Sequence, residues 1–303
     1  MKIILLKQIK KKKRKVLQKE KKKYTQTFVN IKSILILIAF TMLISCEKET
    51  QEIPSYIKIN EYSLYTTASQ GSNSENISDI WVYADDQLIG TFELPATIPI
   101  LLEGETTLKI FSGIKDNGIS EIRIRYPFYD LYEETVILKK DSTINISPNF
   151  TYKPSATLEI DDFESPFWNL DTTINSQIDF QILEENNNKY ASAILDNDNV
   201  IFEVSTKDFE DLPQQGSPIY MEIDYQSNSL LLIGAYINYP FSIINKDLLW
   251  ITPKENWNKI YINLTQTVSE AINNESIKFY MKLVREDTST TSWVNFDNIK
   301  IIY

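Results

Sequence analysis

The sequence contains no histidine and a single cysteine among its 303 residues. Without histidine, the Ser-His-Asp and Cys-His arrangements of nucleophilic catalysis are excluded, as are the usual zinc sites. The single cysteine, Cys46, excludes an intrachain disulfide and any cluster of thiolate metal ligands. Any catalytic chemistry would therefore have to use carboxylate, lysine, tyrosine or hydroxyl groups.

The apolar run at residues 34–45 is only twelve residues long, whereas a membrane-spanning helix needs about 20. It follows a basic segment, because residues 1–45 contain 13 Lys and Arg against one acid, Glu20. A basic region before a short apolar run is typical of a signal peptide. An uncleaved N-terminal anchor is the alternative, and the unusual length of the basic region leaves open how much of it is translated.

The residues that close this run, Leu43-Ile44-Ser45-Cys46, resemble the lipobox of Gram-negative bacterial lipoproteins. The resemblance implies that residues 1–45 are removed and that Cys46 carries a diacylglycerol and palmitate, which anchor the protein at the outer membrane. Residues 46–54 then form a polar tether. Acidic residues after the lipidated cysteine also resemble a signal for the outer face of that membrane. An ordinary solvated linker is the alternative, so the periplasmic and cell-surface faces both stay open.

Basic residues are scarce in the remaining chain. Removal of residues 1–45 leaves 18 of the 31 basic and 40 of the 41 acidic residues, a net charge of −22. This charge excludes a nucleic-acid partner, because phosphate neutralisation needs a basic surface. It also repels anionic lipid head groups, so attachment to a membrane depends on the acyl chains of Cys46.

Residues 55–153 lack the 3.6-residue periodicity of a helix and consist of short β-branched and aromatic runs between turn residues. This pattern predicts a small β-sandwich. The expected strands are residues 56–66, 80–84, 87–93, 106–112, 121–126, 133–139 and 143–147.

Three successive motifs in this region, residues 81–90, Leu94-Pro95-Ala96 and residues 102–110, resemble a PEGA-type β-sandwich. The resemblance implies an accessory or interaction role without catalytic residues. The chain departs from that family by continuing through an aromatic stretch at residues 126–132. These rings are either a platform for stacking on sugars or a cluster that packs a loop onto the sandwich.

A boundary is expected at Lys153-Pro154-Ser155, and residues 154–303 predict a jelly-roll β-sandwich. The expected strands are residues 178–182, 190–195, 199–205, 219–226, 230–238, 259–264, 277–285 and 293–302. Residues 267–273 are long enough for only one or two helical turns. The predicted fold class is therefore all-β, a small N-terminal sandwich followed by a C-terminal jelly roll.

The ends of this second region, Asp162-Phe163-Glu164 and residues 294–301, resemble the first and last strands of jelly-roll carbohydrate-binding modules and galactose-binding-like domains. The resemblance implies binding of a sugar or a cell-surface polymer. Stacking on a sugar needs an exposed planar ring, and the alternative for each ring is a place in the core. The candidate rings are Trp250, Trp257, Trp168, Tyr236 and Tyr239.

The same resemblance implies a structural calcium ion where the first and last strands meet, and calcium takes oxygen ligands. The candidate ligands are Asp161, Asp162, Glu164 and Asp297. The alternative is that these acids cap strand ends at the surface. Residues 196–199 resemble the start of a calcium loop but lack its later glycine and glutamate, so a hairpin turn is the simpler interpretation.

Glu222, Asp224 and Gln226 alternate along one expected strand and therefore share a face. Some jelly-roll glycosidases place acids in this way, but Gln226 cannot exchange a proton near neutral pH. The alternative is a polar concave or solvent-facing surface, and a glycoside hydrolase is only a distant possibility. We thus predict a lipid-anchored, non-enzymatic envelope protein whose jelly roll binds a glycan, with no cofactor beyond the candidate calcium. The alternative is a structural or docking subunit for other envelope proteins.

Overall fold

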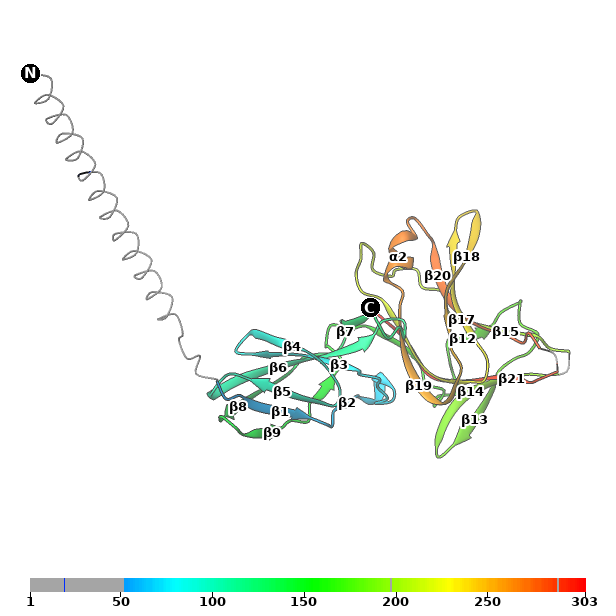
Figure 1. Ribbon diagram of the computed structural model, residues 1–303. Helices are drawn as coiled ribbons and strands as arrows, with labels where there is room; N and C mark the ends of the chain where they lie inside the picture. The colour runs from blue at the N-terminus through cyan, green and yellow to red at the C-terminus, as the bar shows by residue number, and fades with distance from the viewer. Residues whose placement is uncertain (1–18, 20–51, 197, 288) are drawn as a thin grey trace, which may run out of the picture. The chain divides into compact units, whose positions relative to one another are not determined.

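The computed structural model describes residues 19, 52–196, 198–287 and 289–303 (Figure 1). Cys46, the lipobox and the tether up to residue 51 lie outside these residues, so their roles stay predictions. Within the described part of the chain, no helix has the length and apolar character needed to cross a membrane. Ile53–Tyr303 forms one compact unit.

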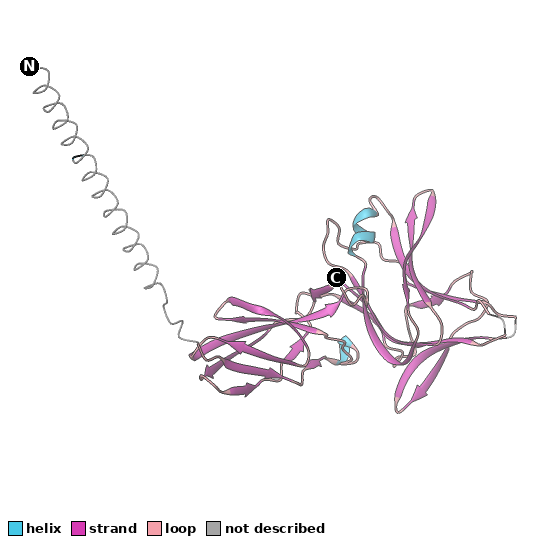
Figure 2. Cartoon of the chain, viewed as in Figure 1, coloured by secondary structure: helices cyan, strands magenta, loops and turns pink. Residues whose placement is uncertain are grey.

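This unit is all-β, as predicted, with two short helices among its strands (Figure 2). A small sandwich comes first and a jelly roll follows, which confirms the predicted fold class. The elements of the first sandwich are β1 (Ser55–Ile59), β2 (Ser63–Tyr65), η1 (Ala68–Gln70), β3 (Asp79–Ala84), β4 (Gln87–Glu93), β5 (Ala96–Ile100), β6 (Gly104–Lys115), β7 (Arg123–Arg125), β8 (Tyr132–Leu138), β9 (Thr143–Asn145) and β10 (Asn149–Thr151).

The first sandwich packs a sheet of order β4-β3-β6-β7, with β8 also paired to β6, against smaller sheets of order β5-β1-β9 and β10-β2. Alternate residues of β1 and β3 are fully buried, among them Ile57, Ile59, Ile80 and Val82. Because successive side chains of a strand point to opposite faces, these residues meet between the sheets and form its core.

The elements of the jelly roll are β11 (Leu158–Asp161), β12 (Leu170–Thr172), β13 (Gln181–Glu185), β14 (Asn188–Leu195), β15 (Ile201–Thr206), β16 (Tyr220–Ser227), β17 (Leu231–Tyr239), β18 (Ser242–Ile251), β19 (Lys254–Asn263), α2 (Thr265–Glu270), β20 (Ser276–Val284) and β21 (Ser292–Ile302). Six strands form sheet I, of order β13-β14-β21-β16-β19, with β11 paired to β21. Five form sheet II, of order β12-β15-β20-β17-β18. The first and last strands of the jelly roll, β11 and β21, are antiparallel neighbours.

The core of the jelly roll lies between sheets I and II. Ile233 of β17 and Phe279 of β20 face it from sheet II, and Ile223 of β16 and Phe296 of β21 face it from sheet I. All four side chains are buried. The opposite face of sheet II is therefore turned away from this core, which leaves its residues available for another role.

The two sandwiches contact each other within the compact unit. Tyr220, Tyr261 and Ile302 of the jelly roll belong to the core cluster of the first sandwich. Tyr126 and Tyr129, from the aromatic stretch, are buried against them. These two rings pack the sandwiches together and present no open face for a sugar. The boundary predicted at residues 153–154 stays a prediction.

Candidate functional site

The outward face of sheet II brings together rings, charges and amides from neighbouring strands. In β17, Leu232, Gly234 and Tyr236 alternate with core residues and so point outward. Strand register then sets their neighbours. Leu232 lies opposite Trp250 of β18 and Lys282 of β20, and Lys282 lies opposite Glu203 of β15. Gly234 lies opposite Tyr280 of β20 and Asp247 of β18. These residues form what we call the sheet II face.

Glu203 is the buried centre of the polar groups on this face. Its Oε1 accepts hydrogen bonds from the Tyr236 hydroxyl at 2.6 Å, from Thr173 Oγ1 at 2.7 Å and from Asn175 Nδ2 at 2.9 Å. Burial by itself would raise the pKa of the Glu203 carboxyl, but these hydrogen bonds and the Lys282 ammonium outweigh it and lower the pKa. Glu203 is therefore ionised at neutral pH and holds Tyr236 and Asn175 in fixed orientations.

The second oxygen of Glu203 is less well satisfied. Lys282 Nζ lies 3.3 Å from Oε2, within ion-pair distance. No donor among the described residues makes a hydrogen bond to this oxygen, although it is buried. The ion pair with Lys282 is therefore the contact that offsets the burial of this oxygen.

Tyr280 lies flat across β17 at Gly234. A Cβ atom at position 234 would come within 2.0 Å of Tyr280 Cζ, so only glycine allows the ring this position. The Tyr280 hydroxyl donates to Asp247 Oδ1 at 2.6 Å, and the ring centroids of Tyr280 and Tyr236 are 4.8 Å apart. The two rings and Asp247 therefore hold one another in place on the sheet II face.

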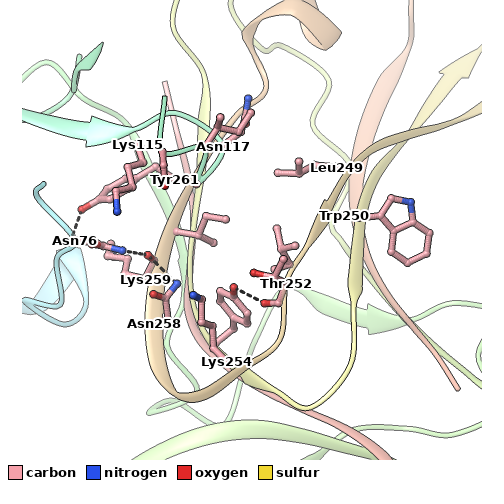
Figure 3. A pocket seen from close by; sticks show the side chains of 16 residues that line it. Asn76, Lys115, Asn117, Leu249, Trp250, Thr252, Lys254, Asn258, Lys259 and Tyr261 are labelled. Carbon is pink, nitrogen blue, oxygen red and sulfur yellow. Dashed lines mark hydrogen bonds between the residues drawn. The ribbon is translucent and has the colours of Figure 1, made fainter. Parts of the chain in front are cut away.

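Trp250 supplies the exposed ring of this face. Its side chain is 50% exposed, which is high for a tryptophan in a strand. Figure 3 shows the indole on the other side of its strand from Leu249, whose side chain points toward a cavity described below. A half-exposed indole on the same face as hydroxyl, amide, ammonium and carboxylate groups suits a polyol, whose C–H faces stack on rings and whose hydroxyl groups form hydrogen bonds.

The five rings singled out in the sequence are divided among several places. Trp250 and Tyr236 share the sheet II face. Tyr239 packs against the jelly-roll core, and Trp168 packs against Phe163 and Phe180. Trp257, in β19 of sheet I, makes an edge contact with Tyr190. That any of these rings binds a ligand stays a prediction.

Several residues of the sheet II face were not singled out from the sequence. They are Thr173, Asn175, Glu203, Asp247, Tyr280 and Lys282. Two of them carried a signal. Glu203 stands between Phe202 and Val204 in one expected strand, and Lys282 stands between Met281 and Leu283 in another. A charged residue at such a position must point away from the core. The other residues are recognised only once strand register is known.

The four candidate calcium ligands have separate partners. Asp162 Oδ1 accepts from the Glu164 amide at 3.2 Å. Asp161 Oδ1 accepts from the Asn169 amide at 2.7 Å, and Glu164 Oε1 accepts from the Lys189 amide at 2.8 Å. Asp297 Oδ2 accepts from Asn188 Nδ2 at 3.0 Å. Burial raises the pKa of Asp297 to about 7, and the charges of Asp224 and Asp162 contribute.

Among the described residues, no three acidic or cysteine side chains are grouped to hold a metal ion. The calcium site stays a prediction. The hairpin turn predicted at residues 196–199 is wrong, because β14 and β15, the strands on either side, belong to different sheets. The Asn199 amide donates to the Asp196 carbonyl at 2.9 Å, so a turn connects the two sheets.

The prediction that Glu222 lies on a polar, solvent-facing surface is wrong. Glu222 has no exposed surface, because the first sandwich covers it. Its two carboxylate oxygens accept the hydroxyl groups of Tyr126 and Tyr152, each at 2.7 Å. The alternation of Glu222 and Asp224 in β16 therefore serves the contact between the sandwiches.

These features define an all-β protein in which a small sandwich is packed on a jelly roll with a ring-bearing outer sheet. No family model and no curated protein matches the chain. Among solved structures, the CBM22-2 xylan-binding domain of Paenibacillus barcinonensis Xyn10C is similar, with 12% identity and a TM-score of 0.37, over 47% of this chain and 97% of that domain. A family 11 carbohydrate-binding module from Clostridium thermocellum has 13% identity and a TM-score of 0.34, over 48% of this chain and 94% of that module. The likeness at these values is distant.

Proposed function

We propose that this protein is a non-enzymatic glycan-binding protein and that the sheet II face is its binding surface. The observation that carries the proposal is the position of Trp250, half exposed on the same face as Tyr236, Tyr280 and the Glu203 network. An aromatic ring next to fixed donors and acceptors can stack on one face of a sugar and bond to its hydroxyl groups.

Rigidity supports this proposal. Glu203 fixes Tyr236 and Asn175, and Gly234 allows Tyr280 to lie against the sheet. A ligand that meets oriented groups loses less conformational entropy from the protein than one that must order them. Lys282 and Asp247, on the two strands that flank β17, add a donor and an acceptor.

We also propose that Cys46 carries lipid and holds the protein at the outer membrane. The lipobox-like Leu43-Ile44-Ser45-Cys46 and the acidic chain that follows it support this placement. An acidic surface is repelled from anionic lipids, so the acyl chains supply the attachment. A glycan-binding face tethered in this way would collect polysaccharide at the membrane.

Affinity electrophoresis in gels cast with single polysaccharides tests the glycan proposal. We expect at least one neutral polysaccharide to retard the purified protein and to retard Trp250→Ala less. If no polysaccharide retards the protein, glycan binding is contradicted. Copurification of envelope proteins in detergent would then favour the docking role.

A further inference from the structure

A second feature of the compact unit is a cavity of about 310 Å³ between the first sandwich and the jelly roll (Figure 3). Lys115 and Asn117, at the end of β6 and in the turn after it, line it from the first sandwich. Lys254, Asn258 and Tyr261 of β19 line it from the jelly roll. Its volume is at the lower end of the range for small-molecule pockets, so its ligand is the size of a monosaccharide.

The charged side chains that line this cavity are all lysines: Lys115, Lys254 and Lys259. No carboxylate side chain is among the lining residues, although acids outnumber bases in the sequence, 41 to 31. A second cavity, of about 460 Å³, shows the contrast, because Glu75, Asp224 and Asp297 line it. The first cavity is thus a local concentration of positive charge in an acidic protein.

The positive charge of Lys259 is offset by two nearby carboxylates. Its Nζ lies 2.7 Å from Glu222 Oε2 and 3.8 Å from Asp224 Oδ1. Lys115 and Lys254 differ, because neither has a carboxylate within ion-pair distance in the described part of the chain.

Two acids of the first sandwich, Asp116 and Glu75, have partners of their own. Asp116, next to Lys115, accepts the Tyr220 hydroxyl at 2.8 Å and the Asn263 side-chain amide at 3.4 Å. Glu75 Oε2 accepts the Ile77 amide at 2.8 Å. Two lysine charges therefore remain without a counter-charge around one cavity.

Two unpaired lysine charges favour an anionic ligand, and neutral hydrogen-bond donors in the cavity lining add to this preference. Asn117 Oδ1 accepts the Asn263 amide at 2.8 Å, and its Nδ2 group can donate to a ligand. Lys254 and Asn258 lie beside each other, across the cavity from Lys115 (Figure 3). Leu249 and Ile260 give the cavity an apolar wall that suits the carbon skeleton of a small molecule.

We propose that this cavity binds a small molecule bearing an oxyanion, with Lys115 and Lys254 as its counter-charges. A sugar acid, with its carboxylate, and a sulfated or phosphorylated compound share this chemistry. Charge-assisted hydrogen bonds from the ammonium groups would hold the oxyanion. Trp250 lines this cavity as well as the sheet II face, but Lys115 and Lys254 lie outside that face, so the proposal does not depend on its function.

Calorimetric titration with galacturonate, galactose and inorganic sulfate tests the proposal on the purified protein. Galacturonate and galactose differ in the carboxylate at C6, so we expect galacturonate alone of the two to bind at this site. Lys115→Gln and Lys254→Gln should each weaken binding about fivefold or more. Lys254→Arg, which keeps the charge, should retain most of the affinity.

Lys140→Gln is the matched control, because Lys140 is an exposed lysine paired with Glu103 on the surface. It removes the same charge from the protein and should leave galacturonate binding unchanged. Sulfate binding with the same dependence on Lys115 and Lys254 would support a general oxyanion site, and its absence would support a carboxylate site. Equal binding of galactose, no binding of either anion, or lysine variants that bind like the parent would overturn the proposal. Tyr236→Phe alters the sheet II face outside the cavity lining and should bind galacturonate normally, so this site and the sheet II face can fail separately.

Discussion

Glu222 and Lys259 form a buried ion pair with 2.7 Å between Oε2 and Nζ, and neither side chain has more than 1% of its surface exposed. They come from neighbouring strands of sheet I, β16 and β19. Tyr126 and Tyr152 of the first sandwich donate to the two oxygens of Glu222. One carboxylate therefore joins the sandwiches through three partners, the Lys259 ammonium and the two tyrosine hydroxyl groups.

Replacement of Glu222 by Gln should destabilise the protein strongly. The change leaves Lys259 charged and buried without its main partner, a situation that costs about 3–5 kcal/mol. Urea unfolding at pH 7, followed by tryptophan fluorescence, measures the loss. Lys246→Gln, which breaks the exposed pair with Glu270, is the control and should lower the stability far less, because surface ion pairs contribute little. A Glu222→Gln protein as stable as the parent would contradict the importance of the pair.

The same carboxylate should make stability depend on pH in the acid range. Burial would raise the pKa of Glu222, but the charges of Lys259 and Lys300 and the hydrogen bonds outweigh it and lower the pKa. A carboxyl whose folded-state pKa is lowered stabilises the protein above the unfolded pKa of about 4.3, and that contribution is lost as pH falls through the folded value.

We therefore expect the free energy of unfolding to fall below about pH 4.3 in the parent. The difference between parent and Glu222→Gln should narrow over the same range, because both then carry a neutral side chain at this position. Unfolding curves at several pH values between 3 and 7 measure this difference. A gap that stays constant to pH 3 would assign the acid sensitivity to other groups, such as Glu203, whose pKa is also lowered.

Gly234→Ala should disturb the sheet II face directly. The new methyl group would meet the Tyr280 ring at 2.0 Å, so the ring must leave its position over β17. Overpacking of this kind costs about 1–3 kcal/mol. Thermal unfolding and near-ultraviolet circular dichroism report the loss of stability and the movement of the ring.

Tyr280→Phe is the matched control for this substitution. It keeps the ring and removes only the hydroxyl that donates to Asp247. We expect a smaller loss, about 1 kcal/mol, and an otherwise similar aromatic spectrum. A Gly234→Ala protein as stable as the parent would contradict the close packing of the Tyr280 ring against Gly234.

Much of the fold follows from local patterns in the sequence. The strand expected at residues 87–93 matches β4, and the short helix expected at residues 267–273 overlaps α2. The strand expected at residues 56–66 is instead two strands, because β1 pairs with β5 and β9 whereas β2 pairs with β10.

Less of the candidate site than of the fold could be predicted from the sequence, for a physical reason. Trp250 lies in β18, which we did not expect, because residues 242–251 mix charged and apolar residues without regular alternation. Its register shifts opposite Ile233 and Gly234, so strand parity alone does not predict which residues share a face. The burial of Glu222 was equally hidden, since it depends on tyrosines about 70 and 96 positions away.

The proposed anchor predicts a change in location. Cys46→Ala removes the only thiol that can carry lipid. We expect the variant to leave the membrane fraction and its N-terminus to lack acyl chains, as mass spectrometry would show. An unchanged distribution, or an unmodified N-terminal methionine on the full-length protein, would contradict the lipobox interpretation.

A comparison of Trp250 and Trp257, exposed tryptophans on opposite sheets, provides the most direct test of glycan binding by the sheet II face. Trp250 is 50% exposed in sheet II and Trp257 is 40% exposed in sheet I. The affinity for the most strongly retarding polysaccharide should be measured by calorimetry for Trp250→Ala and Trp257→Ala in parallel. Loss of one stacked ring costs about 1–2 kcal/mol, so we predict that Trp250→Ala weakens binding about tenfold and that Trp257→Ala binds like the parent. Equal effects of the two substitutions, or weakening by Trp257→Ala alone, would contradict the account.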